Sequence, residues 1–136
     1  MMTRSRALSS LAAGIALALS SAGCGGTNLI GPANQLEVAN NPGFFSLQVT
    51  ALDNVSQTLT YSWTNPGTTA NVNQASSVSS GTATVLVRDA SNAQVYSRNL
   101  ADNGTFNTSA GTTGTWTVVV TLNEVTGTLN FSLDTP

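Results

Sequence analysis

Alternation of apolar and polar positions is the strongest signal in this 136-residue chain, and it begins at Leu36. Short runs place an apolar side chain at every second position, whereas no window keeps the 3.6-residue period of a helix. Such alternation is typical of strands that face a core on one side and water on the other. The predicted strands lie around residues 36–38, 45–51, 59–64, 70–72, 83–87, 95–96, 106, 116–122 and 129–133. They predict an all-β fold, an antiparallel two-layer β-sandwich (Ig-like or jelly-roll-like) of about eight strands over residues 36–136.

Turn residues separate these runs. Asn65-Pro66-Gly67 predicts a type II turn, because Pro fixes φ and Gly accepts the positive φ that this turn needs. Asp53-Asn54 and residues 123–127 are predicted to reverse the chain. The second reversal would close a hairpin between residues 116–122 and 129–133, the best-patterned stretch of the sequence. We expect that hairpin to be well ordered and central to the sheet, because a slip by one residue would turn its apolar set to water.

The aromatic residues fall into two groups by their phase. Trp63 and Trp116 alternate in phase with apolar neighbours, which predicts that both lie in the core. A hairpin tip at residues 90–93 leaves the next strand open to two readings. A loop with an odd number of residues places Val95 in the core, and an even number places Tyr96 there. We favour Val95, which makes Tyr96 the exposed aromatic and the candidate for binding a ligand.

The chain begins with the features of an export signal. Arg4 and Arg6 form a short basic region, and an uncharged apolar run follows from Leu8 to Leu19. That run has about 12 residues, fewer than the about 20 that a bilayer-spanning helix needs. Small residues come next, as a signal peptidase requires. Residues 1–23 are therefore predicted to be a signal peptide, a helix that is cleaved from the mature protein.

The end of this signal resembles the lipobox of bacterial lipoproteins. Leu19, Ser21, Ala22 and Gly23 precede Cys24, the only cysteine of the chain. Ser21 stands where that family usually has Leu. The resemblance implies that a dedicated peptidase recognises these four residues, that the Cys24 thiol is acylated, and that cleavage occurs just before it. The alternative is cleavage after Ala22, which would leave a secreted or periplasmic soluble protein with a free thiol.

Acylation would decide where the protein resides. Stable anchoring takes two signals rather than one, and two or three acyl chains on Cys24 would supply them. Residues 24–35 contain Gly and Pro without a period, so they are predicted to form a flexible tether between this lipidated end and the sandwich. The membrane is thus the expected partner, in the bacterial cell envelope. An Asp directly after the cysteine retains some lipoproteins at the inner membrane, and this chain has Gly25 there. The outer membrane or the cell surface is therefore favoured over the inner membrane.

Composition excludes several classes of function. There is no histidine and no lysine, so His-dependent triads, common zinc sites and Schiff bases are excluded. After removal of the signal, Arg88 and Arg98 are the only cations against six acidic residues. Two arginines do not make the basic patch that nucleic acids require. We expect no enzymatic activity, no cofactor and no nucleic-acid partner.

The acidic residues leave two minor alternatives. Asp53 and Asp102 stand in loops with hard oxygen ligands and are candidates for Ca²⁺, although no Asp-x-Asp-x-Asp run is present and both positions also suit ordinary turns. A carboxylate-dependent hydrolase would need acids such as Asp53, Asp89, Asp102 and Glu124 to converge in one cleft. The sequence alone does not bring them together.

A second resemblance concerns the sandwich itself. The hairpin Val85–Ala90, Gly114-Thr115-Trp116 and the run Gly127–Phe131 are similar to small exported modules of the pre-peptidase C-terminal or GOLD-like kind. Those modules are mostly accessory, which implies no chemistry here. The sequence therefore indicates a non-enzymatic, lipid-anchored envelope protein, a structural or protein-binding module. The alternative is a glycan-binding module that uses exposed aromatic residues.

Overall fold

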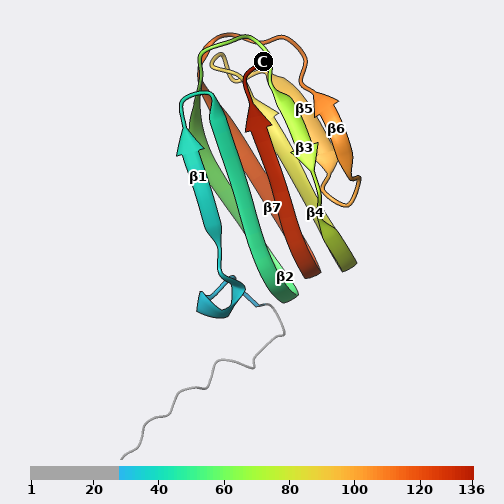
Figure 1. Cartoon of the computed structure of the whole chain (residues 1–136). Helices are drawn as coiled ribbons and strands as arrows, with labels where there is room; N and C mark the ends of the chain where they lie inside the picture. Colours follow the sequence, from blue (N-terminus) through green and yellow to red (C-terminus); the bar gives the residue numbers. More distant parts are fainter. Residues whose placement is uncertain (1–27) are drawn as a thin grey trace, which may run out of the picture.

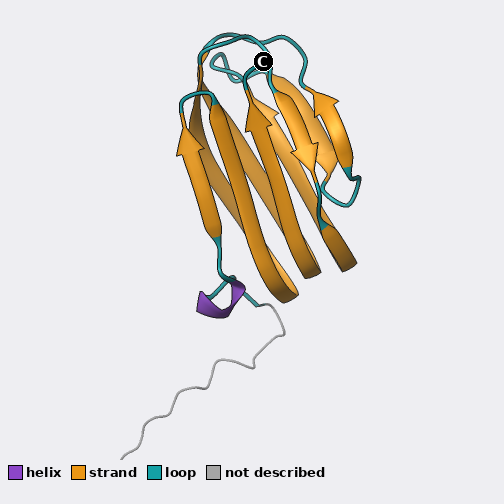
Figure 2. Cartoon of the chain, viewed as in Figure 1, coloured by secondary structure: helices purple, strands orange, loops and turns teal. Residues whose placement is uncertain are grey.

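The computed structural model describes residues 28–136, and strands make up most of them (Figures 1 and 2). A short 3-10 helix, η5 (Pro32–Asn34), precedes seven strands: β1 (Glu37–Asn41), β2 (Phe44–Asn65), β3 (Asn71–Gln74), β4 (Ser77–Arg88), β5 (Gln94–Asn99), β6 (Gly104–Asn107) and β7 (Gly114–Asp134). All of these strands pair antiparallel. The predicted all-β antiparallel fold is confirmed. Residues 28–136 contain no helix with the length and hydropathy of a membrane span.

The longest strands, β2 and β7, each fold back on themselves. They pair along their whole length, from Phe44 opposite Asp134 to Asn65 opposite Gly114. A straight strand of 22 residues would span roughly 70 Å. Yet the rings of Phe45 and Tyr61, sixteen residues apart in β2, have centroids only 5.4 Å apart. The two halves of β2 therefore lie face to face, with the paired halves of β7 beside them.

This folding makes two layers from one continuous sheet (Figure 1). The front layer runs in the order β1, first half of β2, second half of β7, β3, β6. The back layer contains the second half of β2, the first half of β7, β4 and β5. The bends lie at one end, the bend end. The connections between β1 and β2, β2 and β3, β4 and β5, and β6 and β7 lie at the other, the loop end, with the C-terminus.

Bulges produce the bend. The register between β2 and β7 shifts at three successive points between Val49 and Gln57, and β4 shifts against β7 in the same region. An extra residue in one strand of a pair bends that strand and increases its twist. Backbone with positive φ accompanies the shifts, at Ala51, Asn54, Gly81, Glu124 and Gly127. The nine predicted runs, expected to form about eight strands, become seven. Runs 45–51 and 59–64 belong to the single bent strand β2, and runs 116–122 and 129–133 belong to β7.

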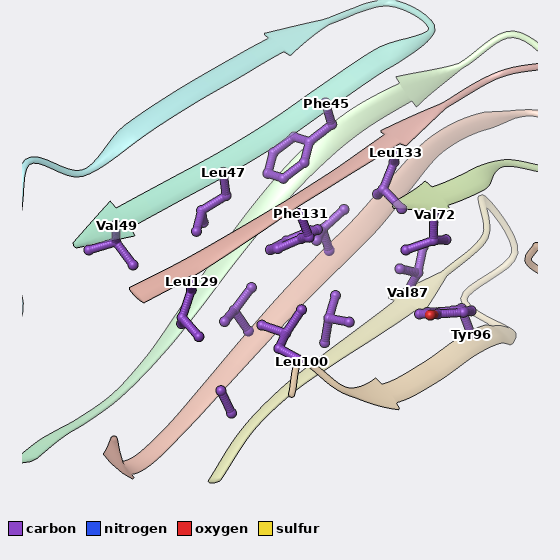
Figure 3. Close-up of a cluster of buried hydrophobic side chains, with 14 of the residues drawn as sticks. Phe45, Leu47, Val49, Val72, Val87, Tyr96, Leu100, Leu129, Phe131 and Leu133 are labelled. Atoms are coloured by element: carbon purple, nitrogen blue, oxygen red, sulfur yellow. The ribbon is translucent and has the colours of Figure 1, made fainter. Parts of the chain in front are cut away.

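The core fills the space between the layers. Figure 3 shows Phe45, Leu47 and Val49 of β2 beside Leu129 and Phe131 of β7, all buried. Near the loop end the rings of Trp63 and Trp116 meet edge to face, with centroids 5.9 Å apart and planes at 88°. Their indole N–H groups donate to the carbonyl oxygens of Asn41 (3.0 Å) and Thr112 (2.7 Å), respectively. The predicted core position of both tryptophans is confirmed.

The predicted hairpin between residues 116–122 and 129–133 is wrong. Val118 pairs with β2 on one side and β4 on the other, and Phe131 pairs with β2 and β3. A strand has only two edges, so neither half of β7 has one left for the other half. The central position of this segment is nevertheless correct, because β7 lies inside both layers.

The choice between Val95 and Tyr96 was a false alternative. A register shift leaves Val87 opposite Tyr96 and Arg88 opposite Gln94, so Val95 is the extra residue of a bulge. Both side chains are buried as a result, Val95 at 6% exposure and Tyr96 at 8%. The Tyr96 hydroxyl donates to Gln74 Oε1 at 2.7 Å. The expectation that Tyr96 is an exposed, ligand-binding aromatic is therefore wrong.

The predicted type II turn at Asn65-Pro66-Gly67 is also wrong, because Gly67 is not at positive φ. The side chain of Asn65, which is buried, organises the loop instead. Its Oδ1 accepts hydrogen bonds from the Gly67 N–H and the Thr135 hydroxyl, each at 2.8 Å. An Asn side chain that accepts from the backbone two residues on takes the place of a backbone turn.

Candidate functional site

The predicted lipidation site lies outside the described residues. Cys24 and the four residues assigned to signal-peptidase recognition, Leu19, Ser21, Ala22 and Gly23, precede Asn28, where the description begins. Acylation of Cys24 therefore stays a prediction, as does the signal peptide.

The structure describes the last eight residues of the predicted tether, 28–35, and they contact the sandwich. The Ser56 N–H donates to the Asn28 carbonyl at 3.0 Å, and the Ile30 N–H donates to Gln57 Oε1 at 2.9 Å. Asn34 Nδ2 reaches the carbonyls of Thr50 and Ala51 at 2.9 and 2.8 Å. Residues 28–35 are thus held against β2, which corrects the expectation of a flexible tether as far as Gln35.

This docking fixes where the chain enters the sandwich. Asn28 forms a parallel bridge with Val55, at the bend end (Figure 1). Only residues 25–27 separate it from Cys24, and four residue steps span at most about 14 Å. Leu29, which is 66% exposed, lies beside this entry point. An anchor on Cys24 would hold the bend end within about 14 Å of its attachment point.

The acidic residues are spread over the molecule. Asp53 and Glu124 lie in the bends of β2 and β7, Asp89 lies at the loop end, and Asp102 lies between β5 and β6. Asp102 pairs with Arg98 across 3.7 Å at the surface. Residues 28–136 contain no group of three or more acidic, His or Cys side chains that could share a metal ion. Asp53 and Asp102, the two calcium candidates, lie at separate places on the fold, and calcium binding at either stays a prediction.

Asp89 has a structural role at the tip between β4 and β5. Its carboxylate accepts hydrogen bonds from the backbone N–H groups of Thr112, Ala93 and Ser91 at 2.8, 2.8 and 3.0 Å. The Ser91 hydroxyl donates a fourth at 2.8 Å. These bonds, chiefly those from Thr112 and Ala93, lower the pKa of the Asp89 carboxyl from 3.8 to about 2. The side chain thus ties the hairpin tip to the loop before β7.

We expect this contact to make folding stability depend on pH. Because the folded-state pKa of Asp89 is depressed, its contribution is fully present above about pH 4 and is lost as the pH falls through about 2. Thermal unfolding midpoints of wild type and Asp89→Asn, measured from pH 7 to pH 2, test this. The wild type should be the more stable at pH 7, and its advantage should shrink below pH 4. An advantage that does not change with pH would contradict this role for the carboxylate.

The outer surface of the front layer carries ordered rows of polar side chains. Register places one residue of each strand in a row across β1, β2, β7, β3 and β6. The first row is Asn41, Phe44, Asp134, Asn71, Asn107. The second row is Ala39, Ser46, Ser132, Asn73, Thr105. We call these two rows the amide face.

Hydrogen bonds between side chains connect the amide face across three strands. In the first row Asn107 donates to Asn71 Oδ1 at 2.6 Å, and Asn71 donates to Asp134 at 3.2 Å. In the second row the Thr105 hydroxyl donates to Asn73 Oδ1 at 2.9 Å. Asn73 in turn donates to Asp134 Oδ1 at 3.4 Å. Both rows therefore end on the same carboxylate, and each amide is oriented by its neighbours.

Phe44 completes the amide face. Its side chain is 41% exposed, and register sets it directly beside Asp134 and Asn41. Sequence reasoning missed this face, because Phe44, Asn73 and Asn107 lie just outside the predicted strand runs. A signal was present at Asn71 and Asn73, which alternate with buried Val72. That spacing marks strand positions on the solvent side.

Comparison with known proteins adds no assignment. No known protein family and no curated protein matches the sequence.

Proposed function

We propose that this protein is a non-enzymatic binding module of the bacterial cell envelope, held close to a membrane by acyl chains on Cys24. The observation that carries this proposal is the docked N-terminal segment. Residues 28–35 are hydrogen-bonded to β2 at the bend end, so the tether between the lipobox-like Cys24 and the sandwich has only residues 25–27. So short a tether favours a domain that stays close to the bilayer, with its long axis along the membrane normal, over one that reorients freely.

The short tether also sets the orientation of the domain relative to the membrane. The bend end would face the lipid, and Leu29 lies on that side, exposed and apolar. The loop end and the C-terminus would point away, with the amide face standing along the side (Figure 1). Each half of β2 is roughly 25–30 Å long, so the upper part of that face would stand clear of the lipid headgroups. A partner in the envelope would therefore meet the amide face or the loop end.

The polar groups favour binding over catalysis. Asp89 and Asp102 lie at separate places on the fold, and the Asp89 carboxylate is occupied by backbone hydrogen bonds. Asp53 and Glu124 share the bend end, but both are exposed. Glycoside hydrolysis by two carboxylates would need a pair set across one scissile bond. The amide face instead offers many neutral donors and acceptors over a broad surface.

Acyl labelling tests the anchor. In cells fed a palmitate analogue we expect the wild-type protein to take up label and to sediment with membranes, because a thioether-linked lipid holds it there. Cys24→Ser should be unlabelled and leave the membrane fraction. Leu29→Ser, which keeps the cysteine, should still be labelled and serves as the matched control. Intact-mass measurement of a mature chain that begins at Gly23 with a free thiol would refute the anchor and favour a secreted or periplasmic protein.

A further inference from the structure

We propose that the amide face binds a neutral glycan chain laid across β2, β7, β3 and β6. The inference rests on the proposed binding function and names its ligand class. Three observations support it: the asparagines of the face, the hydrogen bonds that orient them, and the exposed ring of Phe44 in the first row. Its charge then decides between kinds of glycan.

The residues of the amide face are poor choices for strand stability. Asn is depleted in strands, whereas Thr and Val are enriched. On the outer surface of the back layer, β2 and β7 mostly follow the preference, with Thr58, Thr60 and Thr64 on β2 and Thr115, Thr117, Val119 and Thr121 on β7. The exposed Asn99 of β5 is an exception there. The front layer instead has Asn41, Asn71, Asn73 and Asn107 on its two rows. The asparagines of the front layer lie in two adjacent rows, and such a concentration of poor strand formers indicates a role other than folding.

The hydrogen-bond network leaves capacity for a ligand. An Asn side chain has two donor hydrogens and an acceptor oxygen with two lone pairs. In the network, Asn107 uses one donor on Asn71, and Asn71 uses one on Asp134. Asn107 is exposed, so its second donor hydrogen and its acceptor oxygen are accessible to a ligand. Oriented amides with spare donors and acceptors suit vicinal hydroxyl groups, which both donate and accept.

Phe44 supplies an apolar surface next to this array. An exposed ring buries area against the C–H face of a sugar while the neighbouring polar groups bind its hydroxyls. Phe44 and Asp134 are direct cross-strand partners, so the ring and the end of the network are adjacent. The row from Phe44 to Asn107 crosses three strand spacings, about 14 Å, which is a length for several sugar units rather than one.

Charge selects a neutral glycan. Asp134 is the only charged residue of the amide face. Neither arginine of the described residues lies on it. Arg88 belongs to β4 in the back layer, and the Arg98 guanidinium stacks 3.9 Å from the centroid of the Phe106 ring, which packs against the core. An anionic polysaccharide would meet a carboxylate with no cation to offset it. A peptide would meet little apolar surface apart from Phe44.

Affinity electrophoresis of the full mature chain in detergent tests the proposal. The gels contain neutral polysaccharides (laminarin, mannan or dextran) or anionic polygalacturonate, and pull-down on cellulose and chitin covers insoluble glycans. We expect at least one neutral polymer to bind the wild type and polygalacturonate not to bind it. Phe44→Ala and Asn71→Ala should each weaken binding about tenfold, the size of one good stacking or amide contact. Thr60→Ala, on the back layer, is the matched control and should bind like wild type.

The outcomes separate the two proposals. Equal binding by Phe44→Ala, Asn71→Ala and wild type, binding to polygalacturonate alone, or no neutral polymer bound would overturn the glycan assignment. All three substituted positions are exposed or half-buried, so we expect their thermal unfolding midpoints to match wild type. Equal midpoints show that a variant with weakened binding is still folded. Neutral-glycan binding by a chain whose Cys24 proves unacylated would remove the anchor and leave the assignment of this face standing.

Discussion

Replacing Trp116 by Ala is expected to lower the free energy of unfolding by about 3–5 kcal/mol. The indole is fully buried in β7, meets Trp63 edge to face, and donates to the Thr112 carbonyl. Truncation leaves a cavity between the layers and an acceptor without its donor. A domain of this size has about 5–15 kcal/mol in total, so the loss is a large fraction of its stability. Urea denaturation followed by circular dichroism measures it.

Phe44→Ala is the matched aromatic control for that measurement. The ring is 41% exposed, so its removal leaves no closed cavity. We expect its unfolding free energy to stay within about 1 kcal/mol of wild type. If Trp116→Ala also stays within that range, the two tryptophans do not form the packed contact described between the layers.

Gly127→Ala is expected to cost about 4 kcal/mol or more, combining backbone strain with overpacking. Gly127 has φ of +139°, and a Cβ built on it would meet the Ser77 carbonyl oxygen of β4 at 2.1 Å. Backbone atoms of a neighbouring strand cannot turn aside as a side chain can, so β4 and β7 would have to separate at the bend. Thermal unfolding and the yield of soluble protein measure the effect.

Gly31→Ala is the control, because nothing lies within 4 Å of a Cβ at that position. Its φ of −132° is ordinary for alanine, so the variant should unfold like wild type. Gly81→Ala provides a second view of the same bend, since its Cβ would meet the Glu124 carbonyl oxygen at 2.1 Å. Native stability in both bend variants would show that the strands pass one another farther apart there.

The candidate face shows why sequence reasoning reached the fold but not the surface. Alternation placed Val72 and Leu133 on predicted strands. Successive side chains of a strand point to opposite faces, so Asn71 and Asp134 face away from the core. Alternation gave no information on which strands stand side by side. Asn71 and Asp134 are 63 residues apart in the chain, and only the pairing of β3 with β7 makes them neighbours. The prediction that Tyr96 is exposed was wrong for a related reason. The bulge at Val95 changes the side of the sheet to which the Tyr96 side chain points.

Local chemistry determined what the sequence could settle alone: the strand runs, their apolar faces, the core positions of Trp63 and Trp116, and the scarcity of charge. These depend on a period of two residues, which each strand carries within itself. The tertiary structure decided that β2 and β7 bend rather than close hairpins, that residues 28–35 dock on β2, and that asparagines from three strands form one face. Register shifts and strand order arise from contacts between distant segments, and no single segment encodes them.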